Sequence, residues 1–167
     1  KLGAKIKIKN GYIYATAKNG LKGNAINFPF VSVGATENAI LAAVSAKGRT
    51  IISNCAIEPE IQDMILLLKK IGCNINFISK RKILIFGISE FKKASHEIIF
   101  DRIELGTYLI AGALVGKKII LNKINSTIVN TEIKIMKKMG VRMKVEKSKI
   151  TVFESKKLNS INVKTEA

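Results

Sequence analysis

Apolar and polar positions follow two rhythms along this chain, one typical of helices and one typical of strands. Residues 59–71 carry apolar side chains at intervals of three and four, and Pro59 suits the first position of a helix. Residues 36–46 and 102–115 are apolar almost all round, which predicts helices buried on more than one side. A fourth helix is predicted over about 128–139, and strands are predicted over 5–9, 12–18, 25–28, 51–54, 74–78, 83–86, 97–100, 119–122, 142–146, 150–153 and 161–164.

The same landmarks recur 68 residues apart (122 − 54), which indicates an internal repeat. Gly48 and Gly116 each stand six residues before an asparagine, Asn54 or Asn122, and a further glycine follows each asparagine by 18 residues. Each repeat has the element order βαβαββ. The sequence therefore predicts an α/β (α+β) fold of repeated βαβαββ units, with residues 1–20 and 161–164 belonging to an earlier and a later unit.

The composition is that of a globular protein with an aliphatic core. The chain has 167 residues, of which 47% are apolar and only 6% aromatic, with no Trp. This length suits one ordinary domain or two small ones. The segment 89–95, which contains Lys92 and Lys93, is the predicted boundary between two parts.

The net charge of +17 suggests polyanionic partners, namely nucleic acid, phosphorylated metabolites or an anionic membrane face. However, only four of the 29 basic residues are Arg, and Ile and Asn are also abundant, as A/T-rich codons would produce. Nucleic-acid surfaces usually recruit Arg and aromatic side chains, and both are scarce here. A codon effect is therefore the favoured interpretation, and a basic α/β module that binds nucleic acid or another polyanion stays as the alternative.

Several classes of protein and site are excluded by pattern. No apolar run approaches the roughly 20 residues of a membrane span, and no signal peptide is recognised, so we expect a cytoplasmic protein. Cys55 and Cys73 fit no metal spacing and are expected to be free thiols in the core. His96 is the single histidine and is expected at the surface. We therefore expect neither a metal nor a cofactor.

A short turn of small residues, Ser32-Val33-Gly34, leads into the first predicted helix. Backbone N–H groups at such a turn, together with the positive end of the helix and a serine hydroxyl, can hold a phosphate. The alternative is an ordinary strand-to-helix turn in which Thr36 caps the helix. The lysine of a P-loop is missing.

Two acidic turns are further candidates. Glu58 precedes the helix at 59–71, at the edge of the predicted sheet where ligands of α/β folds gather. Asp101 and Glu104 have the spacing of a capping box around Arg102, which explains them structurally. Yet Asp101 has roughly the place in the second repeat that Ser32 has in the first, so a cleft between two halves stays open as an interpretation.

Beyond these patterns, five stretches of the chain resemble a known family: residues 30–38, 42–43, 48–50, 58–61 and 101–108. In order and separation they look like the UDP-N-acetylglucosamine enolpyruvyl transferases. The sister family of 5-enolpyruvylshikimate-3-phosphate synthases shares the repeat but not these strings. The resemblance implies an inside-out α/β barrel of six βαβαββ units, three in each of two domains. It further implies transfer of the enolpyruvyl group of phosphoenolpyruvate to the 3-hydroxyl of UDP-N-acetylglucosamine, the first committed step of peptidoglycan synthesis.

By the same resemblance the chain is a middle fragment whose partner is the remainder of the same chain. Residues 1–93 would close the first domain and residues 94–167 would open the second. The catalytic cysteine and the ligands of phosphoenolpyruvate should lie outside this segment, so no catalytic residue is expected within it and the fragment should be inactive. Phe100 departs from the family, which often has proline before the aspartate.

The resemblance also implies a role for each candidate residue. It implies that three of them contact the phosphates of the nucleotide sugar and that three line the cleft between the domains. The phosphate contacts are Ser32, Val33 and Gly34, and the residues of the cleft are Glu58, Asp101 and Arg102.

Overall fold

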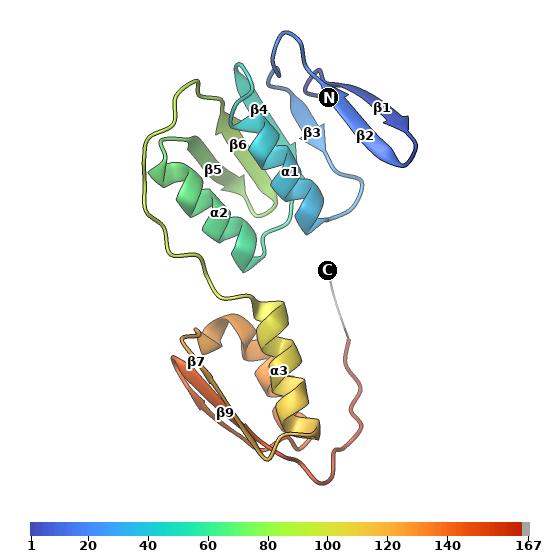
Figure 1. Ribbon diagram of the computed structural model, residues 1–167, viewed down its shortest axis with the longest axis vertical. Helices are drawn as coiled ribbons and strands as arrows, with labels where there is room; N and C mark the ends of the chain where they lie inside the picture. The colour runs from blue at the N-terminus through green and yellow to red at the C-terminus, as the bar shows by residue number, and fades with distance from the viewer. Residues whose placement is uncertain (165–167) are drawn as a thin grey trace. The chain divides into compact units, whose positions relative to one another are not determined.

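The computed structural model describes residues 1–164 and divides into two compact units, the first comprising Lys1–Ile98 and the second beginning at Ile99 (Figure 1). The first unit opens with a hairpin of β1 (Lys5–Lys9) and β2 (Tyr12–Thr16). A sheet with the strand order β3-β4-β6-β5 follows, in which β3 is parallel to β4 and the other neighbours are antiparallel. Its strands are β3 (Ala25–Asn27), β4 (Arg49–Ser53), β5 (Asn74–Ser79) and β6 (Lys82–Phe86).

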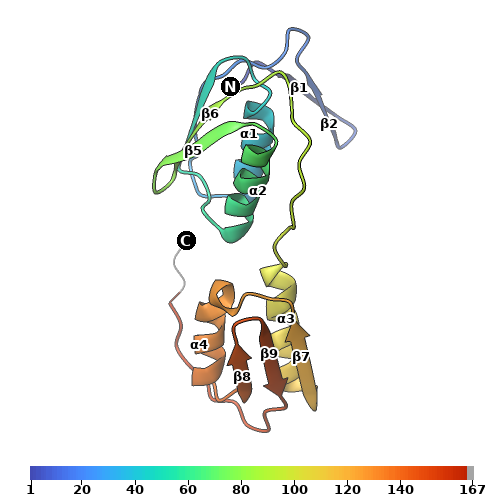
Figure 2. The same cartoon turned by 90° about the vertical axis from the view of Figure 1, so that its left-hand side faces the viewer.

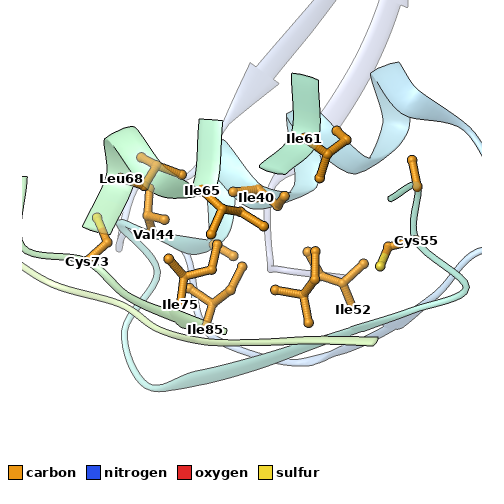
Figure 3. Close-up of a cluster of buried hydrophobic side chains, with 13 residues drawn as sticks. Ile40, Val44, Ile52, Cys55, Ile61, Ile65, Leu68, Cys73, Ile75 and Ile85 are labelled. Carbon is orange, nitrogen blue, oxygen red and sulfur yellow. The ribbon is translucent and has the colours of Figure 1, made fainter. Parts of the chain in front are cut away.

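Helices α1 (Val33–Ala43) and α2 (Pro59–Lys70) cover one face of this sheet, where the two views show them side by side (Figures 1 and 2). The first unit therefore has the predicted βαβαββ order. Its core lies between helices and sheet, and every second residue of β4 and β6 points into it. As expected, the core is aliphatic, because Ile residues of α1, α2 and the strands fill it (Figure 3): Ile40, Ile52, Ile61, Ile65, Ile75, Ile83 and Ile85.

The second unit repeats this plan with one strand fewer. The order of its three-stranded sheet is β7-β9-β8, and α3 and α4 pack on it (Figure 2). The repeat is visible in the strand register, since the first residue of β4 lies opposite Phe86 at the end of β6, and the first residue of β7 lies opposite Phe153 at the end of β9. The elements are α3 (Arg102–Leu114), β7 (Lys118–Asn122), the 3-10 turn η1 (Ser126–Val129), α4 (Asn130–Lys138), β8 (Met143–Glu146) and β9 (Lys149–Phe153).

Two predicted strands do not form. Residues 97–100 and 161–164 have no strand structure, so among the described residues the second sheet has no counterpart of β3. The segment before residue 97 is held on α2 of the first unit, where His96 contacts Asp63. Residues 97–100 directly precede the N-cap Asp101, as residues 28–31 between β3 and α1 directly precede the N-cap Ser32, so they have the place of a turn in the repeat.

Two further predictions need correction. The first helix begins at Val33, three residues earlier than expected. The counterpart of Asn54 in the second unit is Lys123 and not the predicted Asn122. Asn54 and Lys123 each directly follow a strand, and both have a left-handed backbone, with φ of 57° and 56° respectively. Part of the apolar surface of both α1 and α3 is exposed in this structure, since Leu41 and Ile110 are each 53% exposed.

Two fully buried threonines are expected to affect the free energy of unfolding in opposite directions when each is replaced by valine. The Thr36 hydroxyl donates to the Ser32 carbonyl at 2.7 Å and accepts from the Ala56 N–H at 2.9 Å, whereas the Thr50 hydroxyl has no hydrogen-bond partner among the described residues. Valine has nearly the same shape. We expect Thr36→Val to lower the free energy of unfolding by about 1–3 kcal/mol, because it leaves a buried N–H unpaired, and Thr50→Val to raise it by up to about 1 kcal/mol.

Urea denaturation of the two variants measures this difference directly. Each threonine serves as the other's control, since both are buried in the same unit and lose the same atom. Equal destabilisation by the two substitutions would contradict the hydrogen bonds assigned here.

Candidate functional site

The start of α1 differs from the expected turn in the residue that caps it. Ser32 is the N-cap, and its hydroxyl accepts from the Ala35 N–H over 3.3 Å. Thr36, which was expected to cap the helix, lies one turn inside it and faces the core. The prediction that Thr36 is the cap is therefore wrong.

This helix start keeps two donors open. The Ala35 and Thr36 N–H groups are bonded to Ser32, which leaves the N–H groups of Val33 and Gly34 without a partner among the described residues. Gly34 is exposed, its φ is not positive, and a Cβ built on it would meet no atom within 4 Å. Neither backbone conformation nor packing requires glycine there. The open space and the open donors fit the approach of an anion to the positive end of the helix.

Glu58 stands at the equivalent turn before α2. It has the N-cap position, but its Oε2 accepts from the Ile57 N–H over 2.7 Å and makes no capping bond. The turns of Ser32 and Glu58 follow β3 and β4, which are parallel, so both turns lie at the carboxyl edge of the sheet. Thr36 joins the two turns by bonding to both Ser32 and Ala56.

Asp101 and Arg102 lie in the second unit, at the start of α3. The Asp101 carboxylate accepts from the Ile103 N–H at 2.7 Å and from the Glu104 N–H at 3.1 Å, so the predicted cap is confirmed. Because this carboxylate brings a negative charge and already accepts from the Ile103 N–H, the counterpart of the open Gly34 N–H, the start of α3 is not an equivalent anion site. Asp101 lines a groove of about 280 Å³ that runs beside β7 and also includes Glu104, Tyr108 and Lys123.

Both cysteines and the side chain of the single histidine are largely buried. Cys55 and Cys73 are buried free thiols, and burial raises the pKa of each. A raised pKa keeps a thiol protonated and poorly nucleophilic. His96 was expected at the surface, but its side chain is only 8% exposed and its Nε2 lies 2.9 Å from Asp63 Oδ1. The expectation for His96 is therefore wrong.

Sequence reasoning missed the roles of Thr36, Asp63 and His96. A buried threonine that bonds to a distant turn leaves no periodic signal, and the His96–Asp63 pair joins residues 33 positions apart. None of the helices in the described part of the chain is long and apolar enough to cross a membrane. Across residues 1–164, no cluster of three or more His, Cys, Asp or Glu side chains is arranged to hold a metal ion.

Comparison with known proteins finds relatives over the whole chain. The family model described as EPSP synthase (3-phosphoshikimate 1-carboxyvinyltransferase) matches residues 1–167. The UDP-N-acetylglucosamine 1-carboxyvinyltransferase of Pelagibacter ubique is 49% identical over 99% of the chain, and the one of Endomicrobium trichonymphae is 46% identical over 100%. In both cases the chain spans about 40% of the length of the relative.

Solved structures agree on the fold. The enolpyruvyl transferase NikO from Streptomyces tendae matches 94% of the chain with a TM-score of 0.80 at 23% identity. An EPSP synthase from Acinetobacter baumannii matches 98% of it with a TM-score of 0.67 at 18% identity. The repeated α+β fold predicted from the sequence is therefore confirmed. The match of the family model over the full length shows that the chain belongs to the EPSP synthase (3-phosphoshikimate 1-carboxyvinyltransferase) family.

Proposed function

We propose that this chain is part of a UDP-N-acetylglucosamine 1-carboxyvinyltransferase. The enzyme transfers the enolpyruvyl group of phosphoenolpyruvate to the 3-hydroxyl of UDP-N-acetylglucosamine and releases phosphate. The observation that carries the proposal is the 49% identity, over 99% of the chain, to a relative of that name. The proposed enzyme works in the bacterial cytoplasm at the first committed step of peptidoglycan synthesis, and so contributes to cell shape and cell division.

In this proposal the start of α1 receives the phosphates of the nucleotide sugar. The open N–H groups of Val33 and Gly34 donate to phosphate oxygens. The Ser32 hydroxyl is a third donor, and the hydrogen bond that it now accepts from the Ala35 N–H is long, at 3.3 Å. The space above Gly34 admits the ligand. These features support a diphosphate site and give a physical reason for glycine at this position.

The carboxylates of Glu58 and Asp101 and the guanidinium of Arg102 line the cleft between two domains in the same proposal. The first unit is the end of the first domain, and the second unit is the start of the second domain. The catalytic cysteine and the groups that bind phosphoenolpyruvate belong to the remainder of the protein. The present chain therefore supplies binding and positioning and no catalytic residue.

The matching proteins give no support to the alternative of a nucleic-acid module. The relatives and structures that match are enolpyruvyl transferases by name. The net charge of +17 rests mainly on Lys, as the codon interpretation predicts.

A substitution at Gly34 tests the proposed phosphate site. In a full-length protein that contains this chain, Gly34→Ala is expected to weaken binding of UDP-N-acetylglucosamine about ten- to a hundredfold, because the added methyl group occupies the space of the ligand. The free energy of unfolding should stay the same or rise, since that methyl group meets no protein atom. Calorimetric titration with the nucleotide sugar measures the first effect and thermal melting the second.

Gly106→Ala is the matched control, because Gly106 also lies in a helix and a Cβ there also meets nothing within 4 Å. It should leave the dissociation constant unchanged. Ser32→Ala should weaken binding as well, but it also removes the cap of α1 and costs about 1 kcal/mol of stability. Unchanged binding in both Gly34→Ala and Ser32→Ala would remove the phosphate site from the proposal.

A further inference from the structure

The loop of residues 54–58 joins β4 to α2 and carries Glu58 at its end. Hydrogen bonds fix this loop from two sides. On one side it is bound to the turn before α1 and to α1 itself. Asn54 Nδ2 donates to the Phe28 carbonyl at 3.0 Å, in addition to the bond with the Thr36 hydroxyl described above.

Arg81, in the turn between β5 and β6, holds the other side of the loop. Its Nη1 donates to the Cys55 carbonyl at 3.1 Å, and its own carbonyl accepts from the Cys55 N–H at 3.2 Å. One residue therefore satisfies both polar groups of the Cys55 backbone. The Cys55 side chain is fully buried in the core of the first unit (Figure 3), so the middle of the loop is fixed at its backbone and at its side chain.

The charges of Arg81 and Glu58 both act on the Cys55 thiol. Burial raises the pKa of this thiol, the positive charge of Arg81 lowers it, and the negative charge of Glu58 raises it. Such effects require the charged groups to lie near the thiol. Arg81 and Glu58 are therefore neighbours of the same buried residue, which supports a connection between them through the loop.

The Glu58 carboxylate has one oxygen bound and one oxygen open. Oε2 accepts from the Ile57 N–H at 2.7 Å, whereas Oε1 has no partner among the described residues, although the side chain is half-buried. An ionised carboxylate only accepts hydrogen bonds, so Oε1 suits a hydroxyl or an amide N–H of a ligand. Because Oε2 is bound to the backbone of the loop, any shift of the loop also moves Oε1.

We propose that Arg81 is a positioning residue for Glu58. The two bonds between Arg81 and Cys55 hold the loop in place, and the open Glu58 Oε1 then accepts from a hydroxyl or amide N–H of the nucleotide sugar. Arg81 itself does not touch the substrate. The identity of the substrate rests on the proposed function, whereas the bonds between Arg81 and Cys55 do not.

A double-mutant cycle in a full-length protein that contains this chain tests the proposal. Arg81→Met keeps the apolar part of the side chain and removes its N–H donors. It should lower kcat/KM for the nucleotide sugar at least about tenfold, because a misplaced binding group loses its contact. In a Glu58→Ala background the same substitution should lower kcat/KM less than about twofold, since Arg81 acts through Glu58. Arg81→Lys should recover most of the loss, because its ammonium group can donate to the Cys55 carbonyl.

Alkylation of the two thiols tests the Arg81–Cys55 bonds independently of catalysis. In Arg81→Met, Cys55 should react with iodoacetamide at least about tenfold faster than in the wild type, because the loop opens locally. Loss of the positive charge alone would raise the pKa of Cys55 and slow its reaction, so a faster reaction reports opening. Cys73 should keep its rate, which also shows that the variant is folded.

Lys80→Gln is the matched control, because Lys80 is an exposed neighbour of Arg81 in the same turn. It should change neither kcat/KM nor the labelling of Cys55, which is followed by mass spectrometry of the cysteine-containing peptides.

The proposal fails if Arg81→Met leaves kcat/KM unchanged. It also fails if the loss is equal in the wild-type and Glu58→Ala backgrounds, because Arg81 would then act independently of Glu58. A wild-type protein without transferase activity would instead refute the proposed function, and with it the role of Glu58. In either case, unchanged labelling of Cys55 in Arg81→Met would show that Arg81 does not hold the loop.

Discussion

The isolated 167-residue chain is expected to release no phosphate from phosphoenolpyruvate, even with UDP-N-acetylglucosamine present. Under the proposed function the chain provides one side of the nucleotide-sugar site, and the general acid and the ligands of phosphoenolpyruvate lie in the remaining 60% of the enzyme's length, since the chain spans 40% of its relatives. Holding two reactants in the right geometry supplies as much as about 7–11 kcal/mol of the barrier, so a divided site loses nearly all of its rate.

A colorimetric phosphate assay compares the purified chain with a full-length protein that contains it. The full-length protein should release phosphate only when both substrates are present. Phosphate release by the isolated chain that depends on the nucleotide sugar would show that its catalytic groups lie within residues 1–167. Inactivity of the full-length protein would instead count against the proposed function itself.

Gly87→Ala is expected to unfold the first unit or to bring it close to unfolding. Gly87 follows β6, and its N–H donates to the Gly48 carbonyl at 3.0 Å. A Cβ built on it would lie 1.6 Å from the Ala46 carbonyl oxygen and 2.7 Å from the carbonyl carbon. Backbone cannot yield as a flexible side chain does, so the two segments must separate. We expect a loss of about 3 kcal/mol or more, a large part of the 5–15 kcal/mol that stabilises a typical domain.

Urea denaturation followed by circular dichroism measures this loss. Gly23→Ala should behave in the same way, because its Cβ would lie 2.3 Å from the Arg49 carbonyl oxygen. The control in the same unit is Gly34→Ala, whose added methyl group has free space. A midpoint for Gly87→Ala equal to that of Gly34→Ala would mean that the backbone contact between Gly87 and Ala46 is not as close as described.

Much of the fold follows from local patterns. Helix α2 begins at Pro59 and ends before Gly72, whose φ of 100° suits glycine at a helix end, and both signals are visible in the sequence. The Asp101 cap of α3 is equally local, because the carboxylate bonds to N–H groups two and three residues away. The repeat could be found because glycines and strands recur at nearly constant intervals.

Apart from the strands predicted at 97–100 and 161–164, the sequence by itself determined the order of strands and helices, the aliphatic core, the repeat and the turn at Ser32 as a candidate site. Each of these depends on periodicity or on contacts a few residues apart. Only the tertiary structure decided which of Ser32 and Thr36 caps α1, since the buried Thr36 hydroxyl accepts a hydrogen bond from the Ala56 N–H, 20 residues away. It also decided that His96 is buried, since its partner lies on another element. The missing strand at 97–100 was also decided by the tertiary structure, because a short apolar segment forms a strand only by pairing with a neighbouring strand, and no described strand pairs with these residues.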